Sequence, residues 1–362
     1  MGRPKLADAD PRSICVLKPS ALGDVVQSLP LLAPLKRRFP AASISWVIRD
    51  DLAGAVRGNP RIDHVVEFRR RSGVAAWPTL LNTLQEADFD VVLDLQGLLR
   101  TAVMGAVAAA PVRVGLETAR EGSRLACTEI LPGTGRDVPA WDRYLRVADH
   151  LGVPRALPGD GPALAPTAAA VNEARALLAG LPRPLLAVAP GAVWATKKWP
   201  PEHFAGVLAK ARRKLGAGAV ILGAEGDAEI GRRMTTMLGR MTPAARAFRD
   251  LTGRTSLPVL AAVLAECDLA LTNDSGPLHI AAAVGTPSVS VFTCTDPARS
   301  GPPPGPHASV STGLSCAASY KKTCPFRGEK HMACHDEIAA ARVFAVVADM
   351  LESRDDVVRR AA

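Results

Sequence analysis

A loop of small residues that ends in a carboxylate follows the first apolar run of the chain, with the sequence Lys18-Pro-Ser-Ala-Leu-Gly-Asp24. Ser20 and Gly23 let the backbone approach a ligand where a helix begins. Asp24 would then project at the carboxyl end of a strand, where it could take the proton from an acceptor hydroxyl as a general base. On spacing alone, a carboxylate that caps the helix is the more common role.

A second loop, Asn273–His279, has the sequence N-D-S-G-P-L-H and opens a segment of small residues. Gly276 permits close backbone approach, and Pro277 fits the first turn of a helix. The free N–H groups and the helix dipole would favour an anion such as a pyrophosphate. Ser275 adds a hydroxyl donor, and His279 lies one turn further on. An ordinary helix capped by Asp274 or Ser275, with an exposed histidine, fits the same pattern.

Two further turns carry charge next to glycine. Pro190-Gly-Ala192 is followed by Lys197-Lys-Trp-Pro200, whose adjacent ammonium groups could neutralise phosphate oxygens without a divalent metal. The alternative is a solvated loop that Trp199 anchors to the core. In the turn Gly223–Asp227, Glu225 could accept the hydroxyls of a ribose, or it could be a plain carboxylate at a helix start.

Arginines gather in the first half of the chain, where Arg69-Arg70-Arg71 stand with Arg57, Arg61 and Arg100. Such a run is either a solvated face or a surface that binds carboxylates and phosphates bidentately. Near the end, three cysteines and a histidine invite a zinc interpretation: Cys316, Cys324, Cys334 and His335. Their irregular spacing favours buried structural thiols instead, and we expect no metal.

The elements that must position these residues alternate apolar runs of strand length with segments of helical length. This βαβα pattern predicts parallel sheets covered on both faces. Pro and Gly cluster between residues 154 and 166 and predict a linker. Strands are expected at 13–18, 43–48, 64–68, 89–95, 112–115, 185–189, 219–222, 269–272 and 288–292. Helices are expected at 25–38, 74–87, 141–151, 168–178, 202–214, 228–238, 257–265, from about 277, and 336–351.

Composition limits the classes of partner that the protein is expected to bind. The 362 residues carry a net charge of +9, which favours anionic partners. Aromatic residues make up only 4% and no recognition motif is visible, so nucleic acid is not expected. No G-x-G-x-x-G follows the first strand and no P-loop motif occurs, which disfavours a dinucleotide dehydrogenase and a P-loop ATPase.

The expected location is the cytoplasm. The first twelve residues lack the apolar core of a signal peptide, and no run is long enough to span a bilayer. Seven cysteines, an odd number, indicate a reducing compartment.

Taken together, the motifs resemble glycosyltransferase family 9, the lipopolysaccharide heptosyltransferases, over nearly the whole chain. The segments that carry the resemblance are Lys18–Pro30, Asp94–Arg100 (D-L-Q-G-L-L-R), Pro190–Ala192 with Lys197–Pro200, Asp274–His279 and Thr295–Pro297. One departure is that Ala192 and Val193 stand where some members have threonines that bind phosphate. There the backbone N–H groups would have to serve.

The resemblance implies a GT-B fold, with two facing Rossmann-like domains and a cleft between them. Residues 1–165 would bind the acceptor and 166–341 the nucleotide sugar, while the helix 342–362 would pack back on the first domain. It implies inverting transfer of heptose from ADP-L-glycero-β-D-manno-heptose to the lipopolysaccharide inner core, without a catalytic metal or other cofactor. Another nucleotide sugar or acceptor, or an inactive homologue that only binds donor, stays open.

The resemblance also assigns roles to residues. Asp24 would be the catalytic base, and the donor would be bound by Lys197, Glu225, Asp274, Ser275, Gly276 and His279. For the acceptor, an anionic glycolipid at the inner-membrane surface, the candidates are Ser20, Gly23, Arg69, Arg70, Arg71 and Arg100. A protein with such an acceptor could contact the cytoplasmic face of that membrane peripherally.

Overall fold

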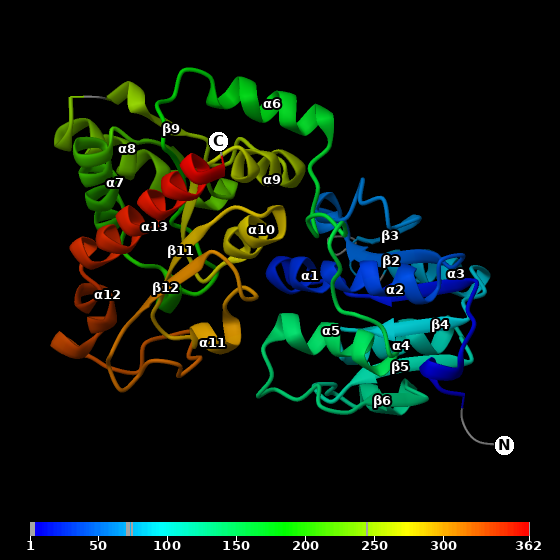
Figure 1. The fold of residues 1–362 in the computed structure, drawn as a ribbon. Helices are drawn as coiled ribbons and strands as arrows, with labels where there is room; N and C mark the ends of the chain where they lie inside the picture. The colour runs from blue at the N-terminus through cyan, green and yellow to red at the C-terminus, as the bar shows by residue number, and fades with distance from the viewer. Residues whose placement is uncertain (1–3, 70–72, 74, 244, 362) are drawn as a thin grey trace. The chain divides into compact units, whose positions relative to one another are not determined.

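The structure, a computed structural model, describes residues 4–69, 73, 75–243 and 245–361 of the chain (Figure 1). Two compact units divide it, Met1–Ala165 and Pro166–Ala362. Within the described residues, no helix has the length and apolar character needed to cross a membrane.

The first unit is built on a six-stranded parallel sheet in the order β3-β2-β1-β4-β5-β6. Most of these strands are apolar runs buried on both faces, as parallel sheets require. From β1 the chain adds β2 and β3 on one side of the sheet, and then β4, β5 and β6 on the other, so the order of strands reverses between β1 and β4. The register pairs Leu17 with Asp94, so the carboxyl ends of these two strands lie side by side. Parallel sheets bind ligands at such a switch point. The strands are β1 (Ser13–Leu17), β2 (Ser43–Arg49), β3 (His64–Phe68), β4 (Val91–Asp94), β5 (Val112–Leu116) and β6 (Glu129–Leu131).

Five α-helices flank this sheet: α1 (Leu22–Ser28), α2 (Leu32–Arg38), α3 (Trp77–Glu86), α4 (Leu99–Val107) and α5 (Ala140–His150). α1 packs against α5, and α3 packs against α4. Leu84 of α3 and Met104 of α4 bury against Leu17 of β1 in one core cluster. The helix predicted at 25–38 is interrupted by a 3₁₀ turn at Leu29–Leu31, because Pro30 cannot donate a backbone hydrogen bond.

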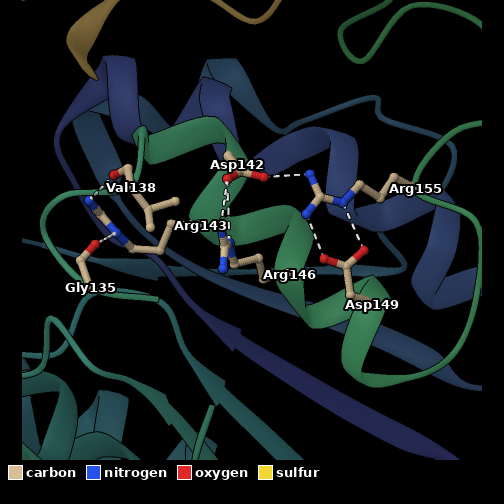
Figure 2. A network of polar contacts seen from close by, with 7 residues as sticks. All are labelled: Gly135, Val138, Asp142, Arg143, Arg146, Asp149 and Arg155. Atoms are coloured by element: carbon tan, nitrogen blue, oxygen red, sulfur yellow. Dashed lines mark hydrogen bonds and ion pairs between the residues drawn. The ribbon is translucent and has the colours of Figure 1, made fainter. Parts of the chain in front are cut away.

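A network of charges on α5 fixes the chain as it leaves this helix (Figure 2). Arg155 binds both carboxylate oxygens of Asp149 and also bonds to Asp142, which Arg146 contacts from the next turn. Arg143 donates to the carbonyl groups of the loop that precedes the helix. α5 is therefore tied at both ends, which stabilises the position of the helix beside α1.

The predicted linker, residues 154–166, is held along the first unit. Arg37 forms a bidentate ion pair with Asp160, both bonds being 2.9 Å long. Asn59 donates to the Ala163 carbonyl at 3.2 Å, and Arg61 donates to the Asp160 carbonyl. Proline and glycine composition thus marks a connection without regular structure, and these polar contacts order it.

The second unit repeats the same topology. Its six parallel strands have the order β12-β11-β10-β7-β8-β9, which is again a reversal between the first and fourth strands of the unit. Ala189 and Thr272 are register partners near the carboxyl ends of these two strands. The strands are β7 (Leu185–Ala189), β8 (Gly218–Ile221), β9 (Phe248–Asp250), β10 (Leu269–Asn273), β11 (Ser288–Phe292) and β12 (His307–Ser311).

The helices of this unit form two groups. α7 packs against α8 and α13, whereas α9 packs against α6 and α10. Phe204 and Leu208 of α7 lie in the same core cluster as Met234 of α8. The helices are α6 (Ala168–Leu178), α7 (Pro201–Leu215), α8 (Ala228–Met241), α9 (Leu257–Ala265), α10 (Gly276–Val284), α11 (Pro297–Ser300), α12 (Ala333–Glu337) and α13 (Ala340–Ala361).

The first turns of the C-terminal helix, α13, pack into the core of the second unit. Val343, Val347 and Leu351 of α13 are buried in the core of the second unit, with Phe204 and Leu208 of α7. Their spacing of four residues puts them on one face of the helix. This apolar face packs with the buried face of α7. Val343, Val347 and Leu351 therefore contribute to the core of the second unit.

Candidate active site

The loop between β1 and α1 brings Lys18 and Asp24 together. Lys18 Nζ lies 3.7 Å from Asp24 Oδ2, with the Lys18 side chain 3% exposed and that of Asp24 42% exposed. Asp24 is the third residue of α1 and an acidic residue of its first turn, while Ala21 stands at the N-cap position. The side chain is thus presented to solvent on one side and held by an ammonium group on the other. This geometry is compatible with a general base and with a carboxylate in the first turn of the helix.

Lys18 is a buried cation with several partners. Its Nζ donates to the Leu95 carbonyl at 3.3 Å and lies 5.2 Å from the ring centroid of Tyr144 on α5. Burial alone would lower the pKa of this ammonium, but Tyr144 and the Asp24 carboxylate outweigh burial and raise the pKa. Lys18 is therefore charged at neutral pH, and the charge next to Asp24 is permanent.

Asp94, at the end of β4, organises the neighbouring loop. Its Oδ1 accepts from the N–H groups of Gln96 and Gly97 at 3.0 and 2.9 Å, and its Oδ2 accepts from the Thr101 hydroxyl at 2.9 Å. Burial raises the pKa of this carboxyl, although these hydrogen bonds oppose the rise. With both oxygens engaged and the residue 5% exposed, Asp94 supports the loop and is not placed to act as a base.

The same loop braces two of the residues predicted for the acceptor. Gln96 Oε1 accepts from the Ser20 backbone N–H at 3.3 Å. Arg100 Nη2 donates to Ser20 Oγ at 3.2 Å. Ser20 and Arg100 are therefore brought together at the β1–β4 switch point, next to the loop that carries Gly23 and Asp24.

The other arginines of the first half are not gathered in this way. Arg69 is exposed just after β3, while Arg70 and Arg71 lie outside the described residues. Arg57 forms an ion pair with Glu67, and Arg61 is engaged with the linker. Arg57 and Arg61 thus have local structural partners, which weakens their assignment to an acceptor surface.

In the second unit, the switch point holds an ion pair between Lys197 and Asp274. Lys197 Nζ lies 2.6 Å from Asp274 Oδ2, and the Asp274 side chain is 5% exposed. Thr295 donates its hydroxyl to the same oxygen at 2.6 Å. The short 3₁₀ turn Ala195–Lys197 supplies the lysine, and the end of β10 supplies the carboxylate. Two predicted donor residues are thus in direct contact.

Asn273 fixes the turn that carries Lys197. Its Nδ2 donates to the Pro190 carbonyl at 2.7 Å, and its Oδ1 accepts from the Trp199 N–H at 3.1 Å. Trp199 is fully buried, and its Nε1 donates to the Ile338 carbonyl at 2.9 Å. Trp199 anchors the loop, as the alternative interpretation of this segment proposed. The role of Asn273 was missed, although it directly precedes Asp274.

Ser275, Gly276 and His279 surround the N-terminus of α10. Ser275 is the N-cap residue, but its side chain makes no capping bond. Its Oγ is buried and has no hydrogen-bond partner within the described structure. Gly276 begins the helix, Pro277 has no N–H group and the Leu278 N–H donates to the Ser275 carbonyl, which leaves the Gly276 N–H at the start of the helix for an anion. His279 is buried in the first turns of the helix, and not exposed as the alternative supposed.

Glu225 is exposed at the start of the 3₁₀ turn Glu225–Asp227, after β8. The described structure shows no hydrogen bond or ion pair between it and the other predicted donor residues. Asp227 is the residue of this turn that contacts the glycine turn, since a Cβ on Gly191 would lie 2.5 Å from its carboxylate. The glycine at 191 is therefore required by the close approach of Asp227.

The cysteines are all free thiols. Burial raises the pKa of Cys334 to about 11, with Cys316 and Cys324 adding to the rise. Cys324 Sγ accepts a hydrogen bond from the Met332 N–H at 3.4 Å. In the part of the chain that the structure describes, no group of three or more His, Cys, Asp or Glu side chains is arranged to hold a metal ion.

Comparison with known proteins decides the family. The family model of glycosyltransferase family 9 (heptosyltransferase) matches residues 77–330, which is more than half of the chain. The chain belongs to glycosyltransferase family 9.

Curated members of the family are similar over most of their length. The lipopolysaccharide core heptosyltransferase OpsX of Haemophilus influenzae is 26% identical over 81% of this chain and 82% of its own length. The lipopolysaccharide heptosyltransferase 1 of Pseudomonas aeruginosa is 27% identical over 87% of this chain and 88% of its own.

Solved structures have the same fold. A family 9 glycosyltransferase from Veillonella parvula is 25% identical, covers 94% of this chain and 98% of its own, and has a TM-score of 0.82. The Escherichia coli heptosyltransferase WaaC, solved with ADP-2-deoxy-2-fluoro heptose, is 20% identical, covers 93% of this chain and 99% of its own, and has a TM-score of 0.69. The predicted α/β fold class, GT-B with two Rossmann-like units, is confirmed.

Proposed function

We propose that this family 9 glycosyltransferase moves heptose from ADP-L-glycero-β-D-manno-heptose to the inner core of lipopolysaccharide. The observation that carries the proposal is the Lys197–Asp274 ion pair at the switch point of the second sheet, beside the N-terminus of α10. An ammonium group and unused helix N–H groups at one place form a site for a diphosphate. The names of the similar proteins supply the sugar and the acceptor.

The donor would bind along the loops of the second unit. Lys197 and the N–H groups at Ser275 and Gly276 would contact the diphosphate, and the unpartnered Ser275 hydroxyl would donate to it. Asp274 would orient Lys197, and Glu225 would accept the ribose hydroxyls. His279, buried in α10, would complete the set. The leaving diphosphate gains charge as the glycosidic bond breaks, so fixed positive groups stabilise the transition state.

The acceptor would bind to the first unit. Asp24 would remove the proton from the attacking hydroxyl in a single displacement, which inverts the anomeric centre and forms no covalent glycosyl-enzyme. Ser20, Gly23 and Arg100 would line the acceptor beside Asp24. Arg69, Arg70 and Arg71 would bind its carboxylates or phosphates and contact the cytoplasmic face of the inner membrane, with the enzyme peripheral to it. No metal or cofactor is invoked, because the proposal assigns stabilisation of the diphosphate to ammonium and N–H groups.

A second candidate function uses the same chemistry with another nucleotide sugar or acceptor, because the motifs determine phosphate and ribose recognition more tightly than the sugar. A homologue that only binds donor is the third alternative. The exposed Asp24 carboxylate paired with a buried lysine argues against it, since binding alone has no use for a base at that place.

A panel of nucleotide sugars tests the proposal by thermal shift, because a ligand stabilises the folded protein by RT ln(1 + [L]/Kd). ADP-heptose should raise the melting temperature more than ADP-glucose, GDP-mannose or UDP-glucose. Product formed from a heptose-deficient lipopolysaccharide acceptor should then show the inverted linkage by NMR. Preference for a uridine or guanosine sugar, or stabilisation by ADP-heptose without transfer, would contradict the proposal.

A further inference from the structure

The charge balance at the donor site leaves part of the diphosphate uncompensated. Lys197 contacts Asp274, a buried carboxylate that the structure keeps next to it at 2.6 Å. The pair is neutral as a whole, whereas the donor of the proposed function carries a negative charge on each phosphate. Additional positive charge must therefore face the diphosphate if Lys197 is to be effective without a metal ion.

A second ammonium group lies beside the first. Lys197 Nζ is 4.7 Å from the ring centroid of Trp194, and Lys322 Nζ is 5.7 Å from the same centroid. Both distances are within the range of a cation–π contact. Lys322 is exposed, and within the described part of the chain it forms no ion pair. The charge of Lys197 is balanced by Asp274, whereas that of Lys322 is not balanced by an ion pair among the described residues.

The backbone that carries Lys322 is tied to the turn that carries Lys197. Thr196, the residue before Lys197, donates its hydroxyl to the Lys321 carbonyl at 2.8 Å. The Thr196 carbonyl accepts from the Thr293 hydroxyl at 2.5 Å. The partly buried Thr196–Lys321 bond thus places the backbone of Lys322 beside the turn that carries Lys197.

We propose that Lys322 is a second cationic ligand of the donor diphosphate, held beside Lys197 by the shared Trp194 indole. The inference rests on the proposed function, whose donor is a nucleoside diphosphate sugar. Without ligand, each ammonium group is kept near the indole and its repulsion by the other is offset by the ring and by Asp274. When a diphosphate binds, Lys322 moves from the ring to a phosphate oxygen.

The neighbouring chain supplies matched controls. Lys321 precedes Lys322 and is also exposed. In the described structure only its backbone carbonyl makes a contact, as the acceptor of the Thr196 hydroxyl. Lys210 on α7 lies 4.7 Å from the ring centroid of Phe344 and so has the same type of contact away from the proposed site. Lys322→Met, Lys321→Met and Lys210→Met each remove one positive charge, while Lys322→Arg retains it.

Isothermal titration of the full-length protein with ADP, AMP and adenosine tests the inference. Lys322→Met should weaken ADP binding about tenfold, which corresponds to about 1.4 kcal/mol. AMP binding should weaken less and adenosine binding should not change, because the effect depends on phosphate charge. Lys322→Arg should bind ADP nearly as the wild type does, and both control variants should bind it normally.

The outcomes separate the two levels of the proposal. If the wild type binds ADP and Lys322→Met binds it equally well, or if Lys321→Met causes the same loss, Lys322 is no specific ligand and the inference is overturned. If the wild type itself does not bind ADP, the proposed function fails first. A fall in the salt dependence of ADP binding for Lys322→Met, and not for Lys210→Met, would further support the contact.

Discussion

The Lys18 ammonium lies 3.7 Å from the Asp24 carboxylate, and the lysine is almost wholly buried while the carboxylate is half exposed. One oxygen of Asp24 is therefore held by the protein, and the other is left for a substrate. A base needs this combination, because its proton acceptor must be both fixed in direction and accessible. Asp24 also lies in the first turn of α1, where the helix dipole favours a carboxylate.

We predict that Asp24→Asn abolishes most of the catalysis. Asparagine keeps the shape and caps a helix as well as aspartate does, but it cannot take a proton. General-base catalysis contributes about 10²–10⁴-fold, so kcat should fall by that factor while the donor Kd stays within a few-fold of the wild type. Single-turnover kinetics with saturating donor measure the first quantity, and titration with ADP measures the second. A variant with near-normal kcat would return Asp24 to a structural role.

Lys18→Met should lower kcat and leave the fold intact. Methionine fills the same buried space without charge, and the Asp24 carboxylate that loses its partner stays solvated because its side chain is 42% exposed. Loss of the charge-assisted contact that orients Asp24 is worth about 1.5–3 kcal/mol, or about 10- to 100-fold in kcat. The matched control is Lys36→Met. Lys36 pairs with Asp63 and is more exposed than Lys18. A loss of melting temperature parallel to the loss of kcat would instead assign Lys18 to the core.

Charge reversal at Arg69, Arg70 and Arg71 tests where the acceptor binds. We expect the acceptor KM to rise and the salt dependence of activity to flatten, because fewer positive groups attract the anionic glycolipid. The donor Kd should not change, since the donor residues belong to the second unit. Reversal of Arg57, which is paired with Glu67, should have less effect on KM. An equal loss of donor affinity in the triple variant would show that the two sites are wrongly assigned.

The strands at the centre of each sheet could be predicted because they are continuous apolar runs. The missed strands lie at or near sheet edges, where burial is partial and the pattern is weak. β6 and β9 have three residues each, and β12 consists largely of small and polar residues. α4, with the sequence L-R-T-A-V-M-G-A-V, was also missed.

The loops of the site could be predicted from glycine, proline and charge at strand ends, since parallel strands of a sheet end at the same edge. Contacts between residues far apart in sequence could not. Lys322 reaches Trp194 only because Thr196 binds Lys321 across 125 residues. Tyr144 meets Lys18 only because α5 packs on α1. No local pattern indicates either contact, because one depends on a bond between two loops and the other on the packing of α5 against α1.

The last prediction is that donor binding depends on Lys197 and not on a divalent cation. Lys197→Ala removes one charge-assisted contact to phosphate, which should weaken donor binding by about 2 kcal/mol.

The same change leaves Asp274 buried, with only the Thr295 hydroxyl to satisfy it, so the melting temperature should also fall. The double variant Lys197→Ala/Asp274→Asn removes that unpaired charge and should recover stability without recovering donor affinity. This split separates the binding role of Lys197 from its structural one.

EDTA should leave wild-type activity nearly unchanged, because ammonium and helix N–H groups face the diphosphate. An enzyme that stops on chelation and restarts with Mg²⁺ would contradict this account, because the cation would then supply the charge here assigned to Lys197.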